Sequence, residues 1–142
     1  MNYYLDTNIF LYAGDSTSDL HTSSRRLLEA VADGKITAFT STETFQEIIY
    51  VGQKEKRLSH ALQIFDEAFI IIDVVLPIGR AEISKLRILA QQYPTVEGRD
   101  LLHAAAALNA DIPYIVSYDT DFNHIKDIQR IPPETLLEIL EG

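Results

Sequence analysis

Apolar residues along this chain follow two spacings, one typical of strands and one typical of helices. Short stretches with apolar residues predict strands at residues 3–5, 35–40, 69–75, 114–117 and 128–131. The β-branched run at 69–75 is apolar on successive residues, as expected for a strand covered on both faces. Between the predicted strands, apolar residues recur every three or four positions and predict amphipathic helices. We expect these helices at 18–33, from Ser41 or Thr42 onwards, at 60–68, from Pro77 onwards, at 99–110 and at 133–140.

Strands that alternate with helices predict a three-layer α/β/α sandwich around a mostly parallel sheet of about five strands. No repeat, low-complexity tract or Gly/Ser/Pro-rich linker divides the sequence, so we expect residues 1–142 to form a single domain. In such sheets, sites form outside the carboxyl ends of the strands, near the point where strand order reverses. Residues that directly follow the predicted strands are therefore the first candidates for function.

The charge balance is acidic, with 12 basic and 21 acidic residues and a net charge of −9 among 142 residues. This argues against holding nucleic acid through a broad basic surface, although it permits a nucleic-acid substrate gripped at one place. The absence of cysteine excludes disulfide scaffolds, thiolate zinc sites and thiol nucleophiles. With no signal-peptide pattern and no membrane-length apolar stretch, we expect a cytoplasmic protein without membrane contact.

Several acidic residues are predicted to meet at one edge of the sheet. Asp6 directly follows the first strand, Asp119 and Asp121 follow the fourth, Asp100 begins the Ala-rich helix, and Glu47 lies in the helix after the second strand. Each has an ordinary explanation as a helix cap, a turn residue or a solvated side chain. Together, carboxylates within about 4–6 Å of one another would raise each other's pKa, a cost that a hard divalent cation removes. Oxygen-only ligands select Mg²⁺ or Mn²⁺.

Two neighbouring residues leave alternatives open. Glu43 lies one helical turn before Glu47 on nearly the same face, so helix geometry alone does not choose between them. His103 shares a helix face with Asp100, but a satisfied core histidine is the commoner outcome for such a position than a ligand or an acid–base group.

Four short strings occur in an order that resembles a known family. They are Leu5-Asp6-Thr7-Asn8, then Glu47 in its helix, then Arg99-Asp100-Leu101-Leu102-His103-Ala104-Ala105, and finally Ser117-Tyr118-Asp119-Thr120-Asp121-Phe122. The chain is similar in these strings, in total length and in element order to PIN-domain nucleases. More specifically, it resembles VapC-type ribonuclease toxins of bacterial toxin–antitoxin pairs.

This resemblance implies a metal site with Asp6 and Asp100 as the principal ligands of Mg²⁺, for which Mn²⁺ can substitute. It also implies that the acidic pocket is completed by Glu47, Asp119 and, as an auxiliary acid, Asp121. Here the choice of Glu47 over Glu43 rests on the family's spacing. The supporting positions are Thr7, Asn8 and Ser117, of which Asn8 and Ser117 match residues that hold the acids by hydrogen bonds.

The resemblance further implies hydrolysis of RNA phosphodiester bonds by metal-activated water, without a side-chain nucleophile. It implies a homodimer and a cognate antitoxin protein that covers the acidic pocket. The residues that could line an RNA groove are Arg99, Lys54, Lys56 and Arg57, although a solvated helical face explains these cations as well.

Two other classes also gather acids at strand ends: aspartate-based phosphatases or phosphotransferases, and non-catalytic receiver-type modules. The first needs an acid two residues after Asp6, where this chain has Asn8. A receiver needs paired acids after the first strand and a lysine after a late one. Asp73 could imitate one receiver acid, but no lysine follows the strand at 114–117.

Overall fold

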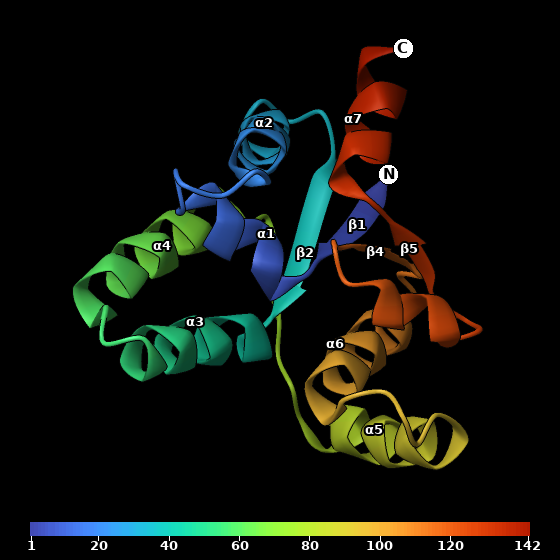
Figure 1. The fold of residues 1–142 in the computed structure, drawn as a ribbon. Helices are drawn as coiled ribbons and strands as arrows, with labels where there is room; N and C mark the ends of the chain where they lie inside the picture. The colour runs from blue at the N-terminus through green and yellow to red at the C-terminus, as the bar shows by residue number, and fades with distance from the viewer.

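The computed structural model describes residues 1–142, and its centre is a five-stranded sheet in which every pair of neighbours is parallel (Figure 1). The strand order is β3-β2-β1-β4-β5. The strands are β1 (Asn2–Leu5), β2 (Thr37–Ser41), β3 (Val74–Leu76), β4 (Tyr114–Val116) and β5 (Gln129–Ile131). The predicted fold class, a helix-covered parallel sheet, is confirmed.

Helices cover both faces of the sheet. They are α1 (Thr7–Ala13), α2 (His21–Ala32), α3 (Thr42–Lys54), α4 (Leu58–Ile71), α5 (Arg80–Gln92), α6 (Gly98–Asn109), α7 (Pro133–Glu141) and the short 3-10 helix η1 (Thr120–His124). In Figure 1, α1, α3 and α4 lie on one side of the sheet, α5 and α6 lie on the other, and α7 packs beside α2. None of these helices combines the length and the apolar character needed to cross a membrane.

Residues of β1 divide between two hydrophobic clusters, because successive strand residues point to opposite faces. Tyr3 and Leu5 pack into the cluster formed with α1 to α4 and α7. Tyr4, between them, packs into the cluster formed with α5, α6 and η1. β1 is also the central strand, with β2 on one side and β4 on the other, so the strand order reverses beside it. The carboxyl end of β1 is therefore the switch point at which parallel sheets build sites.

The predicted strand at 69–75 is wrong in its position. Residues 69–71 form the last turn of α4, and the strand begins at Val74. An apolar run of this length does not distinguish a buried strand from a helix. Ala68 in the helix and Ile72 directly after it are buried in the core, whereas Phe69 and Ile70 are 63% and 82% exposed.

The following helix also starts later than predicted, at Arg80 and not at Pro77. β3 continues to Leu76, and the chain turns into α5 at Gly79. The backbone N–H of Gly79 donates to Glu82 Oε1 at 2.7 Å, which satisfies a donor at the helix start.

Helices α3 and α4 approach each other closely at Gly52. A Cβ atom at Gly52 would lie 2.3 Å from Ala61 Cβ, which is attached directly to the α4 backbone. We therefore expect Gly52→Ala to lower the free energy of unfolding by about 1–3 kcal/mol, despite the higher helix propensity of alanine. Gly98→Ala is the control, because nothing lies within 4 Å of its Cβ position. Urea unfolding measures the stability of both variants. Equal losses of stability in Gly52→Ala and Gly98→Ala would contradict the close approach of α3 and α4.

Candidate active site

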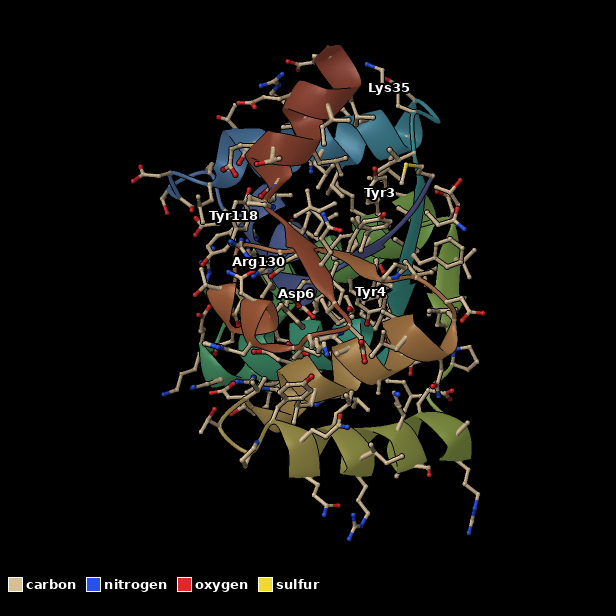
Figure 2. All side chains as sticks on the ribbon, turned by 90° about the vertical axis from the view of Figure 1, so that its right-hand side faces the viewer. Tyr3, Tyr4, Asp6, Lys35, Tyr118 and Arg130 are labelled. Atoms are coloured by element: carbon tan, nitrogen blue, oxygen red, sulfur yellow. The ribbon has the colours of Figure 1, made fainter.

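Asp6 connects the carboxyl end of β1 to the start of α1. Its Oδ1 accepts the Thr7 N–H at 2.7 Å, and its Oδ2 accepts the Ser117 hydroxyl at 2.6 Å. The side chain is the N-cap of α1 and also lies at the switch point. The same carboxylate can therefore act as a helix cap and as a site residue. Asp6 is only 5% exposed, and burial raises its pKa although His103 and these hydrogen bonds oppose the shift. Figure 2 shows Asp6 and Tyr4 near each other, between α2 and α7 above and α5 and α6 below.

Ser117, directly after β4, joins Asp6 to the loop that follows. Its hydroxyl oxygen accepts the Asp119 N–H at 2.9 Å and the Asn8 side-chain amide at 3.2 Å. The structure thus places two of the three predicted supporting residues, Asn8 and Ser117, in contact with each other, and Ser117 in contact with the first acid. Asn8 Oδ1 is buried and has no hydrogen-bond partner.

Asp100, Asp119 and Asp121 form a cluster in which each offers one oxygen, and these oxygens lie within 4.8 Å of one another. Asp100 lies in the first turn of α6, while Asp119 caps η1 by accepting the Asp121 N–H at 2.9 Å. Burial, together with the hydrogen bond and charge of Asp119 and the charge of Asp6, raises the pKa of Asp100 to about 8. Without a cation, mutual repulsion opposes ionisation of all three carboxyl groups. A bound divalent cation makes their ionised forms favourable. It is able to hold a metal ion.

Glu47, and not Glu43, lies with the other acids. A pocket of about 200 Å³ is lined by Asp6, Asp100, Asp119 and Glu47, together with Thr7, Asn8 and Arg99. Glu43 lines the neighbouring hollow, beside Tyr50 and Arg99. Burial and the charge of Glu47 raise the pKa of Glu43. Asp121 does not line the pocket and joins the group only through its contacts with Asp100 and Asp119.

His103 lies beneath the acids and is only 1% exposed. Its Nε2 donates to Glu47 Oε1 at 2.6 Å and lies 3.6 Å from Asp6 Oδ1, and its Nδ1 lies 2.5 Å from the Tyr4 hydroxyl. Burial disfavours the protonated ring, but Tyr4, Glu47 and Asp6 outweigh it and raise the pKa of His103 well above its usual value. The sequence favoured a satisfied core histidine. The ring is buried and satisfied, yet one of its partners is a site acid.

Only one of the predicted RNA-contacting cations lines the acidic pocket. Arg99 lines the acidic pocket, and Arg57 lines a separate groove of about 310 Å³ between α1, α3 and α4. Lys54 lies over the Tyr50 ring with its Nζ 6.0 Å from the ring centroid. Lys56 is exposed in the turn after α3 and lines neither cavity. The groove and the acidic pocket are adjacent, since both are lined by Asn8, Leu11 and Val51.

Asp73 does not join the site. It precedes β3, and its Oδ2 accepts the Ala38 N–H at 2.7 Å near the amino end of β2. Asp6 lies at the carboxyl ends of the strands, on the opposite side of the sheet. Asp73, the residue that could imitate a receiver acid, therefore holds the start of β2 and is not part of the site.

The fold and the acids at its switch point define a helix-covered parallel α/β protein with a candidate metal site, and comparison with known proteins gives its family. The model of the PIN domain family matches residues 3–128, and the chain belongs to this family. It is similar to ribonuclease VapC13 of Mycobacterium tuberculosis, with 31% identity over 127 residues, covering 89% of this chain and 97% of that protein. Ribonuclease VapC7 of the same species is 28% identical over 131 residues, covering 92% and 90%.

Solved structures agree on the fold. VapBC2 of Rickettsia felis, bound to a promoter DNA fragment, aligns with a TM-score of 0.72 at 24% identity, covering 93% of this chain and 98% of that one. VapC20 of M. tuberculosis, described as a toxin that cleaves the sarcin–ricin loop, aligns with a TM-score of 0.69 at 15% identity, covering 87% and 95%. The predicted resemblance to VapC-type PIN-domain proteins is confirmed. None of these matches favours a phosphatase or a receiver module.

Proposed function

We propose that residues 1–142 act as one domain with divalent-metal-dependent endoribonuclease activity, and that the chain is the toxin of a toxin–antitoxin pair. The observation that carries the proposal is the meeting of Asp6, Glu47, Asp100 and Asp119 around one pocket, in a PIN-family chain whose relatives are VapC ribonucleases. The donors are four carboxylates from separate parts of the chain, which fits Mg²⁺ and allows Mn²⁺ as a substitute.

Each acid has a role in this proposal. Asp6 and Asp100 are the principal metal ligands, and Ser117 fixes the Asp6 carboxylate by its hydrogen bond. A bound divalent cation supplies a water of lowered pKa and neutralises charge on the phosphate. The remaining acids would orient water by hydrogen bonds or admit a second ion: Glu47, Asp119 and Asp121. Arg99, at the rim of the pocket, binds a phosphate of the RNA backbone.

The proposal includes two protein partners. A cognate antitoxin protein covers the acidic pocket, with a segment in the adjoining groove between α1, α3 and α4. The fold shared with VapBC proteins of R. felis and nontypeable Haemophilus influenzae supports this partner. A second copy of the chain forms a homodimer, for which the exposed apolar side chains of α4 offer surface: Leu58, Leu62, Phe69 and Ile70. We place the protein in the cytoplasm.

Metal removal tests the activity directly. The purified chain is expected to cut single-stranded RNA in Mg²⁺, to lose this activity in excess chelator, and to recover it when Mn²⁺ is added. The reason is that the clustered carboxylates cannot bind an RNA phosphate without a cation between them. Mapped RNA ends report cleavage. Undiminished cleavage in excess chelator would overturn the proposal, and a trapped phosphoaspartate at Asp6 would favour the phosphatase alternative.

A further inference from the structure

We propose that His103 is a positioning residue, which holds the Glu47 carboxylate by Oε1 and leaves Oε2 directed to the acidic pocket. The inference deepens the proposed function and rests on it, because it assigns a role toward the same metal site. His103 does not line the pocket, so it acts through Glu47.

The contact between the two side chains is short and sheltered. His103 Nε2 donates to Glu47 Oε1 at 2.6 Å, and this is the only hydrogen bond that the Glu47 carboxylate makes. A glutamate side chain loses roughly 1.5–2 kcal/mol of conformational freedom when it is fixed, so a helix backbone alone does not hold its carboxylate in one place. The imidazole supplies that constraint and occupies one oxygen, which leaves the other for a ligand.

The imidazole is itself fixed to the sheet. His103 Nδ1 hydrogen bonds to the Tyr4 hydroxyl at 2.5 Å, and that hydroxyl donates to Ser41 Oγ at 2.7 Å. The Tyr4 and His103 rings pack edge to face, with centroids 5.6 Å apart. Tyr4 and Ser41 are fully buried on β1 and β2. These contacts thus connect β2 and β1 through His103 on α6 to Glu47 on α3. They restrict the motion of the long Glu47 side chain.

Asp6 has hydrogen-bond partners of its own, outside the series of contacts that links Ser41, Tyr4, His103 and Glu47. Its oxygens already accept the Thr7 N–H and the Ser117 hydroxyl, and its 3.6 Å distance from His103 Nε2 is longer than a hydrogen bond. Loss of the imidazole should therefore release Glu47 and leave Asp6 in place. Hydrogen bonds from outer residues to metal-binding groups typically change metal affinity or activity by about 10–100-fold.

Two polar substitutions of His103 separate positioning from a merely structural role. In His103→Gln the side-chain amide reaches about as far as Nε2 and can still donate to Glu47. In His103→Asn the shorter amide reaches only the region of Nδ1, so it keeps the Tyr4 contact and loses Glu47. We expect His103→Asn to weaken Mn²⁺ binding by about 10–100-fold and His103→Gln to stay within a few-fold of the wild type. Titration of the metal-free protein followed by electron paramagnetic resonance measures this affinity, with circular dichroism as the check on folding.

Glu47→Gln completes the test. His103→Asn should add little to the loss of Mn²⁺ affinity that Glu47→Gln causes alone, because the imidazole acts on the metal site through the Glu47 carboxylate. Equal Mn²⁺ affinities in His103→Asn and His103→Gln, or fully additive losses with Glu47→Gln, would overturn the inference. If the expected affinities appear but the wild type cuts no RNA, the proposed function fails and the positioning role stands. RNA cleavage by the wild type with no effect of either His103 variant on Mn²⁺ binding would remove the inference alone.

Discussion

Replacing Asp6 with asparagine is expected to abolish RNA cleavage while the fold stays intact. The asparagine oxygen can still accept the Thr7 N–H, and asparagine is a favoured N-cap, so α1 keeps its start. Ser117 Oγ already accepts two hydrogens, so its hydroxyl loses the Asp6 Oδ2 acceptor, a loss of about 1 kcal/mol that leaves the fold intact. What is lost is one negative charge at the candidate metal site. Charge stabilisation by the metal is worth several kcal/mol, which corresponds to a loss of roughly 1,000-fold or more in rate.

The control for this substitution is Asp127→Asn. Asp127 is exposed and lines neither the pocket nor the groove, yet its replacement changes the net charge by the same amount. Single-turnover cleavage of RNA in Mg²⁺ measures both variants, and we expect Asp127→Asn to match the wild type. Induction in a bacterial host followed by mapping of RNA ends gives a second readout. Full activity of Asp6→Asn, or equal losses in the two variants, would reject the assignment of Asp6 to the site.

The positions of the acids could be predicted because they depend on chain order more than on packing. A residue that directly follows a parallel strand lies at the carboxyl edge of the sheet, whichever helices cover it. This placed Asp6 and Asp119 correctly. Asp100 follows no strand directly, because it lies in the first turn of α6, which comes after α5. Its expected role as a principal metal ligand came from the resemblance to PIN domains.

Helix geometry alone did not choose between Glu43 and Glu47, and the choice of Glu47 from the sequence rested on the resemblance to PIN domains. Both residues lie on α3 about one turn apart, and only the rotation of that helix relative to the sheet decides which one enters the pocket. Periodicity shows which face of a helix is apolar, but it does not fix the rotation to within the angle that separates neighbouring polar positions. The same limitation applies to residues 69–72, where an apolar run fits a strand and a helix equally well until its neighbours are known.

The role of His103 was hidden for a different reason. Its partners are Tyr4 and Glu47, which are far from it in the sequence, and each looks like an ordinary core or surface residue by itself. A signal was nevertheless present. Strand alternation turns Tyr4 to the face opposite Leu5, and helix periodicity places His103 on the same side of α6 as Asp100. Combining the two periods predicts that the phenol and the imidazole meet under the site.

The metal-free protein is expected to lose stability as the pH rises from about 4 to about 8, and Asp100 should account for much of the change. In the native protein its pKa is raised to about 8 from 3.8. Between these pH values the unfolded chain has released a proton that the native carboxyl keeps. The free energy of unfolding therefore falls with rising pH, by up to about 1.4 kcal/mol per pH unit for this group. Below the window the carboxyl is protonated in both states, and above it the carboxyl is ionised in both, so the contribution is constant there.

Asp100→Asn removes this titrating group, so the variant in chelator should show a shallower pH dependence and exceed the wild type in stability near pH 8. The advantage should shrink or reverse in saturating Mg²⁺, because the cation binds the ionised carboxylates of the native wild type and stabilises it by mass action. Urea unfolding at several pH values, with chelator and with Mg²⁺, measures the four curves. Parallel curves for wild type and variant in chelator would show that Asp100 is ionised in the native protein across this range. The carboxylates would then be compatible with one another without a cation, which removes the physical reason for placing one among them.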